Sequence, residues 1–415
     1  MKYKIIVAHP GQQHSYKVTT ALKKAGVLYK FFTCVYDKQN SFSMKIAHFL
    51  VRGRDIKKIK KRKCEFIEDN DVILYYTFLS LIVIILSRFK FTTKFSLWLD
   101  RKISDSFGIK VAKYAIKHNV NAVICFSTNE TKCFEYLKKH APNIKRICDC
   151  ANAPISYMKY IYEQDMKKFN HDELKKEVPE FWNEKIIRKE KEGIDYTNLF
   201  LAPSKFVAKG LNFCGVDNKQ IFIVPYGSNF DVTEKQINTL KEIRFLYVGQ
   251  VSYRKGMHHL LNIFSKLKYD NAFFDVVGAV NKYSNLYEKY KDCTNINFYG
   301  NVLHDDVKHF LLKNDVFVFP SLTEGLSLSC LEAAAYGLPL IISNNSGAND
   351  MVENGYNGFV FDYDDEKSLE NYLIYFIENK KEIPKFSKNI LETAKNYTWI
   401  KYNERILNII KEIFK

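Results

Sequence analysis

Short apolar runs alternate with longer amphipathic stretches along the whole chain, and this alternation constrains the fold more than any other feature. Runs of strand length rich in Val, Ile and Phe lie at residues 4–8, 27–34, 121–126, 146–150, 199–202 and 221–225, and again at 243–249, 273–278, 296–300, 316–320, 338–343 and 358–361. Strands that are apolar throughout are typical of parallel sheets covered by helices on both faces. We therefore expect an α/β protein with two doubly wound parallel sheets.

The two series of strands predict two domains. The chain has 415 residues, enough for two or three domains at about 100–200 residues each. The polar stretch 231–242 separates the two series, so we place one domain at 1–232, a second at 233–395 and a terminal amphipathic helix at 396–415. Each series opens with a strand, a glycine-containing turn and a helix. Open α/β sheets bind ligands at the carboxyl ends of their strands, which predicts a site in a cleft between the domains.

Positive charge is concentrated in the first third of the chain. The formal net charge is +17, and residues 1–150 hold 29 basic against 11 acidic residues. The densest cluster lies at residues 52–63, which predicts contact with an anionic membrane surface. The expected membrane contacts are Lys57, Lys58, Lys60, Lys61, Arg62 and Lys63. The cluster has no interleaved aromatic residues and no accompanying nucleic-acid motif, so we expect no nucleic-acid partner.

An uncharged run from Val72 to Ser87 follows the basic cluster. As a helix it would be about 24 Å long, too short for the ~30 Å hydrocarbon core of a bilayer. Two interpretations stay open: a buried core helix, or a helix whose apolar face enters the membrane surface. The opening apolar run at residues 5–8 is too short for a signal peptide, and the nine cysteines are scattered. We therefore expect a cytoplasmic protein held at the inner face of a membrane.

Residues 316–343 carry the clearest chemical pattern. They predict a strand, a loop, a helix capped by Ser327 or Ser329 and ended by Gly337, and a further strand. The amino terminus of such a helix favours phosphate binding. Glu324 in the loop and Glu332 in the helix supply carboxylates, which accept hydrogen bonds from sugar or ribose hydroxyls.

The sequence pattern of these residues resembles that of the retaining glycosyltransferases of family four. Enzymes of this family have the GT-B fold of two facing Rossmann-like domains. The family's E-x7-E signature matches Glu324 to Glu332, and its donor-phosphate loop matches residues 248–256. Shorter supporting matches lie at residues 9–15, 202–207, 224–229 and 300–307.

The resemblance implies roles for residues of the second domain. Glu332 would hold the ribose of a nucleotide sugar and Glu324 would lie near the transferred sugar, while Lys255 and Arg254 would stabilise the departing diphosphate. The remaining expected donor contacts are Gly249, Gln250, Gly325, Leu326 and Ser327. Gln250 departs from the family, which usually has Arg there.

The resemblance implies that the first domain binds the acceptor. The turn of Gly11, Gln12 and His14 would approach the donor phosphate or the reacting sugar. Asn152 lies where many relatives carry a sugar-contacting His. His258 and His259 are expected to have packing or solvent roles only.

The function expected from these residues is retaining transfer of a sugar from a UDP- or GDP-sugar to a saccharide or lipid-linked acceptor, in surface polysaccharide or glycolipid assembly. We expect no metal and no other cofactor. The alternatives are a GT-B epimerase or phosphorylase, and a non-catalytic protein that binds membrane or nucleic acid.

Overall fold

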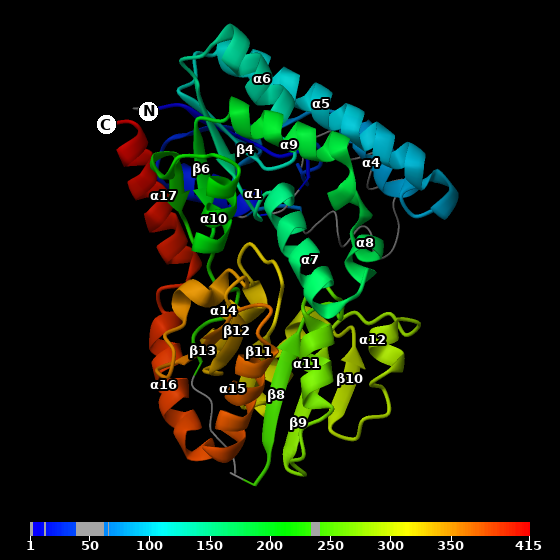
Figure 1. The fold of residues 1–415 in the computed structure, drawn as a ribbon. Coiled ribbons are helices and arrows are strands. Elements are labelled where there is room, and N and C mark those ends of the chain that lie inside the picture. Colours follow the sequence, from blue (N-terminus) through cyan, green and yellow to red (C-terminus); the bar gives the residue numbers. More distant parts are fainter. Residues whose placement is uncertain (1–2, 12–13, 39–61, 65, 234–240) are drawn as a thin grey trace.

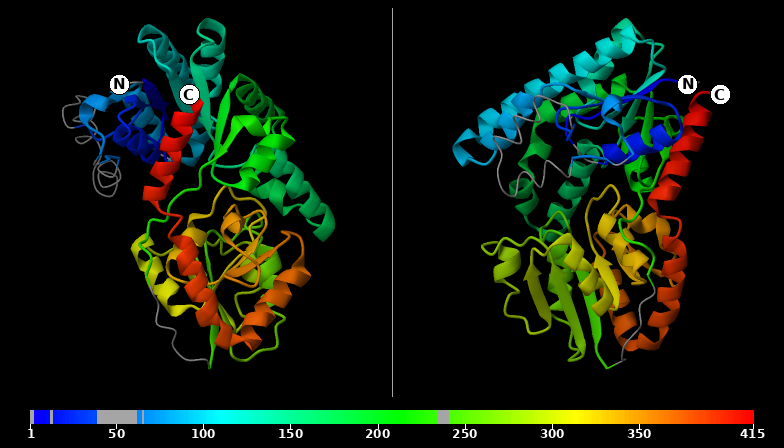
Figure 2. Two further views of the ribbon diagram at one scale, coloured as in Figure 1. Left: turned by 90° about the vertical axis from the view of Figure 1, so that its left-hand side faces the viewer. Right: turned by 180° about the vertical axis from the view of Figure 1, so that it is seen from behind.

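Two parallel sheets, each enclosed by helices, are stacked one above the other in the computed structural model (Figure 1). The structure describes residues 3–11, 14–38, 62–64, 66–233 and 241–415. The α/β fold class with two doubly wound parallel sheets is confirmed. Figure 2 shows the same two layers from the side and from behind.

The first sheet has seven strands in the order β3-β2-β1-β4-β5-β6-β7. The strands are β1 (Ile5–Ala8), β2 (Leu28–Thr33), β3 (Val72–Leu74), β4 (Ala122–Phe126), β5 (Lys145–Asp149), β6 (Leu199–Ala202) and β7 (Ile221–Ile223). The helices around it are α1 (Ser15–Lys24), α4 (Thr77–Leu86), α5 (Thr93–Lys117), α6 (Thr131–His140), α7 (Ile155–Phe169), α8 (Glu173–Glu177), α9 (Glu184–Tyr196) and α10 (Lys205–Phe213).

The second sheet has six strands in the order β10-β9-β8-β11-β12-β13. Its strands are β8 (Ile243–Val248), β9 (Ala272–Val277), β10 (Ile296–Gly300), β11 (Val316–Phe319), β12 (Leu340–Ser343) and β13 (Gly358–Phe361). Its helices are α11 (Met257–Phe264), α12 (Asn285–Glu288), α13 (Val307–Lys313), α14 (Leu328–Ala335), α15 (Glu366–Glu378) and α16 (Ile383–Ala394).

Both sheets reverse their strand order at a central pair, and these two points position the site. In the first sheet β1 pairs with β2 on one side and with β4 on the other, all parallel. In the second sheet β8 lies between β9 and β11 in the same way. At such a reversal the loops that follow two neighbouring strands run in opposite directions, and this leaves a crevice for a ligand. The loops after β1, β8 and β11 therefore carry the candidate residues.

The apolar run Val72–Ser87 is neither a single helix nor a buried core element. Its first residues form the edge strand β3, whose Phe31-to-Val72 register continues the first sheet. The rest forms α4, in which only Thr77 and Leu81 are buried. Of the two open interpretations, a buried core helix does not hold, because α4 packs on α5 and buries only Thr77 and Leu81. In the described part of the chain, no helix is long and apolar enough to cross a membrane.

The chain returns to the first domain at its end. Helix α17 (Trp399–Ile413) leaves the second domain and lies along α1 (Figure 2). The Tyr3 hydroxyl donates to the Phe414 carbonyl at 2.9 Å, and the two rings stack. The segment 234–240, next to the expected boundary at 232/233, lies outside the described residues.

Most of the basic cluster lies outside the described residues. This holds for Lys57, Lys58, Lys60 and Lys61, whereas Arg62 and Lys63 are described. Lys63 is exposed and Arg62 is half-buried.

Candidate functional site

The loop after β8 places Lys255 at the start of α11. Gly256, the residue before α11, has φ of +67°, and a Cβ there would lie 1.9 Å from the Pro320 carbonyl oxygen. A residue with a side chain would push the loop away from the end of β11. Leu322 N–H donates to the Arg254 carbonyl at 3.1 Å, which joins the two loops. The backbone thus brings the donor-phosphate loop against the loop that carries Glu324.

Lys255 and Glu324 form an ion pair in the crevice. The Lys255 ammonium contacts Glu324 Oε2, and the two side chains are 12% and 21% exposed. Burial lowers the pKa of Lys255 to about 7, and the neighbouring Arg254 guanidinium acts in the same direction. The structure therefore brings together three of the residues that the sequence predicts to act on the donor.

Glu332 projects from α14, whose start is defined by a side-chain cap. The Ser327 hydroxyl accepts a hydrogen bond from Cys330 N–H at 3.3 Å, as an N-cap residue does. Ser327 N–H itself donates to the Ser346 carbonyl at 3.3 Å, so this group is already engaged within the second domain. Gly337 has φ of +73° just past the helix, which confirms the predicted stop.

Two residues that the sequence analysis did not single out hold the Glu332 carboxylate. Asn229 Nδ2 donates to Glu332 Oε1 at 3.3 Å, and His304 Nε2 lies 3.1 Å from the same oxygen. Glu332 is 5% exposed, whereas 55% of the His304 side chain is exposed. Both residues belong to motifs that carried the resemblance, at 224–229 and 300–307, so the motifs were the available signal.

On the first domain, His14 is held by hydrogen bonds at the end of the first sheet. His14 Nε2 lies 2.8 Å from Asp149 Oδ1 and 3.4 Å from the Tyr226 hydroxyl. Gly11 N–H donates to His9 Nδ1 at 2.8 Å. The backbone of Gly11 is not left-handed, and a Cβ there would contact only the His9 ring, at 3.1 Å. Gln12 lies outside the described residues.

Asn152, Gln250 and Arg254 line one cavity of about 310 Å³ between the domains. Tyr162 and Glu177 from the first domain complete its wall. Glu177 is a further residue that the sequence did not reveal: its carboxylate accepts from Tyr253 N–H at 2.8 Å and from Arg254 N–H at 3.4 Å. A side chain of the first domain therefore fixes the donor-phosphate loop of the second.

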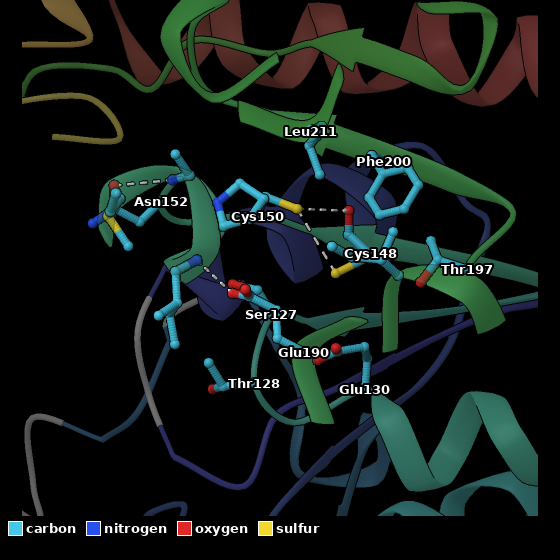
Figure 3. A pocket seen from close by; sticks show the side chains of 15 residues that line it. Ser127, Thr128, Glu130, Cys148, Cys150, Asn152, Glu190, Thr197, Phe200 and Leu211 are labelled. Carbon is cyan, nitrogen blue, oxygen red and sulfur yellow. Dashed lines mark hydrogen bonds between the residues drawn. The ribbon is translucent and has the colours of Figure 1, made fainter. Parts of the chain in front are cut away.

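Asn152 also lines a small apolar cavity of about 90 Å³ in the first domain (Figure 3). Cys148 and Cys150 lie in its wall with their sulfur atoms 3.8 Å apart, and both are buried free thiols. The hydrogen bond with Cys150 raises the pKa of Cys148 well above its usual value, and burial acts in the same direction. Burial also raises the pKa of the nearby Glu130 carboxyl to about 7. These thiols are structural in character.

The two domains touch at the Glu324–Gly325 loop. A Cβ on Gly325 would lie 1.9 Å from the Ala151 carbonyl oxygen, so glycine allows the backbones to approach each other. The Ser204 hydroxyl, which caps α10, donates to the Gly325 carbonyl at 2.5 Å. The Tyr162 hydroxyl and the Thr323 hydroxyl lie 2.5 Å apart. The carboxylate loop is therefore held from both domains.

Comparisons with known proteins agree with this geometry. Residues 230–396 match the family model described as glycosyl transferases group 1. The UDP-Gal:alpha-D-GlcNAc-diphosphoundecaprenol alpha-1,3-galactosyltransferase of Escherichia coli is 30% identical over 184 residues, which cover 40% of this chain and 47% of that relative. The N,N'-diacetylbacillosaminyl-diphospho-undecaprenol alpha-1,3-N-acetylgalactosaminyltransferase of Campylobacter jejuni is 23% identical over 266 residues, 62% of this chain and 68% of that relative.

The whole chain matches solved structures of the same fold. The structure of Anabaena HepE in complex with UDP has a TM-score of 0.63 and 13% identity, and the match covers 99% of this chain and 100% of that one. In sequence, the chain spans about half the length of the first curated relatives it matches. Residues 230–396 are thus a glycosyl transferases group 1 domain, and the chain carries this domain on the two-domain GT-B fold.

Proposed function

We propose that this chain is a retaining glycosyltransferase that moves a sugar from a UDP-sugar to a lipid-linked saccharide, in the assembly of a surface polysaccharide or glycolipid. The observation that carries the proposal is the partly buried Lys255–Glu324 pair, which lies beside Arg254 in the crevice of a glycosyl transferases group 1 domain. A UDP donor is supported by the name of the Escherichia coli relative and by the UDP complex of the Anabaena protein.

The charges in the crevice suit the departure of a nucleoside diphosphate. As the glycosidic bond breaks, the electron pair of that bond goes to the diphosphate oxygen, and negative charge grows there. The Lys255 ammonium and the Arg254 guanidinium would stabilise that charge. Glu332, held by Asn229 and His304, would accept hydrogen bonds from the ribose hydroxyls. We propose that these cations serve the transfer step without a metal or other cofactor.

The acceptor would enter from the first domain. The names of the two relatives specify acceptors on diphosphoundecaprenol or diphospho-undecaprenol, which supports a lipid-linked acceptor here. His14 and Asn152 lie on the first-domain side of the crevice and would contact the acceptor or the reacting sugar. The acceptor oxygen would attack the anomeric carbon on the face that the diphosphate leaves. Its proton would pass to a leaving phosphate oxygen, so the anomeric configuration is retained.

The tip of the first domain supports docking on a membrane. Helix α4, the turn after it and the start of α5 project from the domain on the side away from α17 (Figure 1). Large apolar side chains are exposed there, and Phe91 is 86% exposed. The set comprises Phe78, Leu79, Ile85, Phe89, Phe91, Phe95, Leu97 and Trp98. Arg88, Lys94, Arg101 and Lys102 lie in the same stretch, as suits a surface that meets anionic lipid.

Vesicle flotation tests this docking. We expect the wild-type protein to float with phosphatidylglycerol vesicles, and the Phe91→Ser/Trp98→Ser double variant to lose most of that binding. Tyr283→Ser is the matched control, because Tyr283 is an aromatic residue of the second domain with 94% exposure. Equal flotation of the double variant and the wild type would contradict docking through the tip. Undiminished binding to neutral phosphatidylcholine vesicles would contradict the role of charge.

Product analysis tests the transfer itself. The protein is incubated with UDP- or GDP-linked sugars and a detergent-solubilised undecaprenyl-diphosphate saccharide, and the anomeric configuration of the product is read by NMR. We expect one donor to give a product with the donor's configuration, and Glu324→Gln to reduce its formation. An inverted product, or sugar phosphate formed from the saccharide, would overturn the proposal. Visible absorbance of bound pyridoxal phosphate would indicate a phosphorylase.

A further inference from the structure

A cluster of three histidines surrounds one buried carboxylate where the two domains meet, away from the Lys255–Glu324 pair. The carboxylate is Asp165 of α7, which belongs to the first domain and is fully buried. His258 and His259 open α11 in the second domain. His171 follows α7, and a left-handed Asn170 with φ of +51° turns the chain back so that His171 returns to Asp165.

All three histidines direct Nε2 at the same carboxylate. His171 Nε2 and His258 Nε2 lie 2.9 and 3.2 Å from Asp165 Oδ2. His259 Nε2 lies 2.9 Å from Asp165 Oδ1. One oxygen of Asp165 and one nitrogen each from His258 and His259 lie within 4.8 Å of one another. Zinc binds nitrogen and oxygen ligands at about 2.0–2.1 Å, so ligands of one ion lie about 3.3 Å apart. The three contacts of the histidines to Asp165, at 2.9–3.2 Å, have about this length.

A further carboxylate orients one of the histidines. His259 Nδ1 lies 2.9 Å from Glu366 Oε1 at the start of α15. A histidine that ligates a metal through one nitrogen commonly donates its other N–H to a carboxylate, which fixes the ring and raises its basicity. Among the described residues, the ion-pair partners of Asp165 are His171, His258 and His259. Asp165 and the three imidazoles are therefore packed together with little solvent, and Glu366 lies at the partly exposed edge of the cluster.

We propose that Asp165, His258 and His259, whose ligand atoms lie within 4.8 Å of one another, bind one divalent ion of the zinc class, and that His171, which contacts Asp165 Oδ2, moves toward the ion as its fourth ligand. The set consists of imidazole nitrogens and one carboxylate oxygen, the ligand types that zinc and cobalt accept in tetrahedral sites. A dication would compensate both Asp165 and Glu366 without a protonated imidazole.

The ion would act as a structural clasp between the domains. Asp165 and His171 come from the first domain, and His258 and His259 from the second. His258 lies three residues after Lys255, so the clasp would hold the base of the donor-phosphate loop that Glu177 also contacts. The site is outside the transfer chemistry and does not depend on the proposed activity.

Metal titration of the full-length protein tests the clasp. The purified protein is stripped with EDTA, exchanged into chelator-free buffer and titrated with CoCl2 and, separately, ZnCl2. We expect one Co²⁺ per chain, with the visible absorption of a tetrahedral site and without the near-ultraviolet band of thiolate ligands. The thiolate band matters because the chain has nine free cysteines. Bound Zn²⁺ should raise the melting temperature.

Variants assign the ion to these residues. Asp165→Asn and the double variant His258→Gln/His259→Gln should lose the cobalt spectrum. Glu366→Gln should weaken affinity about tenfold to a hundredfold, as other changes next to a metal ligand do. His140→Gln is the matched control, because His140 is exposed at the end of α6.

Three results would overturn the clasp. The first is the absence of stoichiometric Co²⁺ or Zn²⁺ binding by the wild-type protein. The second is a thiolate band in the cobalt spectrum, and the third is unchanged metal binding in ligand variants that fold. If the ligand variants do not fold, the wild-type stoichiometry and spectrum together with Glu366→Gln decide the question. Nucleotide binding is measured on the same samples, so loss of the clasp is distinguished from loss of the donor site.

Discussion

At the scale of single residues, Lys255 is the group on which the proposed chemistry depends most. Its ammonium contacts a carboxylate, Glu324, and is close enough to a second cation, Arg254, to have its pKa lowered, in a crevice that leaves little of it exposed. An incoming diphosphate would add negative charge to this place. The pair with Glu324 therefore holds the ammonium in position before the donor arrives, which limits the reorganisation needed during transfer.

Removal of the Lys255 charge should slow transfer far more than it weakens binding. For Lys255→Ala we expect kcat to fall about 100-fold to 1000-fold, the range measured when one preorganised transition-state contact is removed. Lys255→Arg keeps a cation and should retain more activity. Steady-state kinetics with the identified donor provide the measurement, and Lys289→Ala, at an exposed position of the second domain, is the control. A wild-type kcat in Lys255→Ala would contradict the assignment.

The pH dependence follows from the same residue. Because burial lowers the pKa of Lys255 to about 7, the side chain is charged below that pH and neutral above it. The charged and titratable groups around the Lys255 side chain are Glu324, Arg254, Glu177 and the Cys330 thiol. Burial raises the pKa of that thiol to about 12. We expect kcat/KM for the donor to fall as pH rises through about 7, because this ratio reports the free enzyme. Lys255→Arg should remove the fall. A flat wild-type profile up to pH 9 would show that Glu324 keeps the ammonium charged.

At the scale of elements, the local sequence predicted the strands well because each is a continuous apolar run. The strand β3 was missed for the same reason: its three residues merge with α4 into one apolar run, and no polar residue marks the boundary. The cap and stop of α14 were also predictable, since both depend on residues within one turn of the helix ends.

Contacts between distant segments could not be predicted from local pattern. Glu177 on the donor-phosphate loop, Asn229 on Glu332 and the histidines on Asp165 come from elements that are separated along the chain. The packing of whole domains determines which of these elements lie close together. The local periodicity of the sequence does not predict those contacts.

The side-chain cap of Ser327 stabilises the start of α14, the helix that carries Glu332. Ser327→Ala removes the hydrogen bond from Cys330 N–H and should lower the free energy of unfolding of the second domain by about 1 kcal/mol. It should also raise the KM for the donor, because α14 carries Glu332. Urea denaturation and steady-state kinetics give the two values. Ser284→Ala, which removes the cap of the remote helix α12, should leave the KM unchanged; equal effects of the two variants on KM would contradict the argument.

At the scale of the whole molecule, the two domains meet through several contacts of different kinds. The Gly325 loop contacts Ala151, Ser204 donates to the Gly325 carbonyl, and α17 lies along α1. Closure of two domains around a donor excludes water and favours transfer over hydrolysis. The closeness of the backbones at Gly325 is the contact most sensitive to a single added atom.

Gly325→Ala should therefore prevent full closure. The new Cβ would lie 1.9 Å from the Ala151 carbonyl oxygen, so we expect a larger radius of gyration by small-angle X-ray scattering and a greater share of donor hydrolysis. Gly26→Ala is the control for general destabilisation, because φ of +67° strains the backbone there while the new Cβ would meet no atom within 4 Å. Unchanged scattering and an unchanged ratio of transfer to hydrolysis would contradict a role for this contact in closure.

The donor site is proposed to bind a nucleoside diphosphate in the second domain, between Lys255, Arg254 and Glu332. Isothermal titration of the wild-type protein with UDP, GDP, ADP and CMP, with and without EDTA, tests it most directly. We expect one nucleoside diphosphate, UDP, to bind in both conditions, Glu332→Ala to lose at least tenfold in affinity, and Lys289→Ala to bind like the wild type. Absence of binding by every nucleotide, or equal affinity in Glu332→Ala, would contradict it.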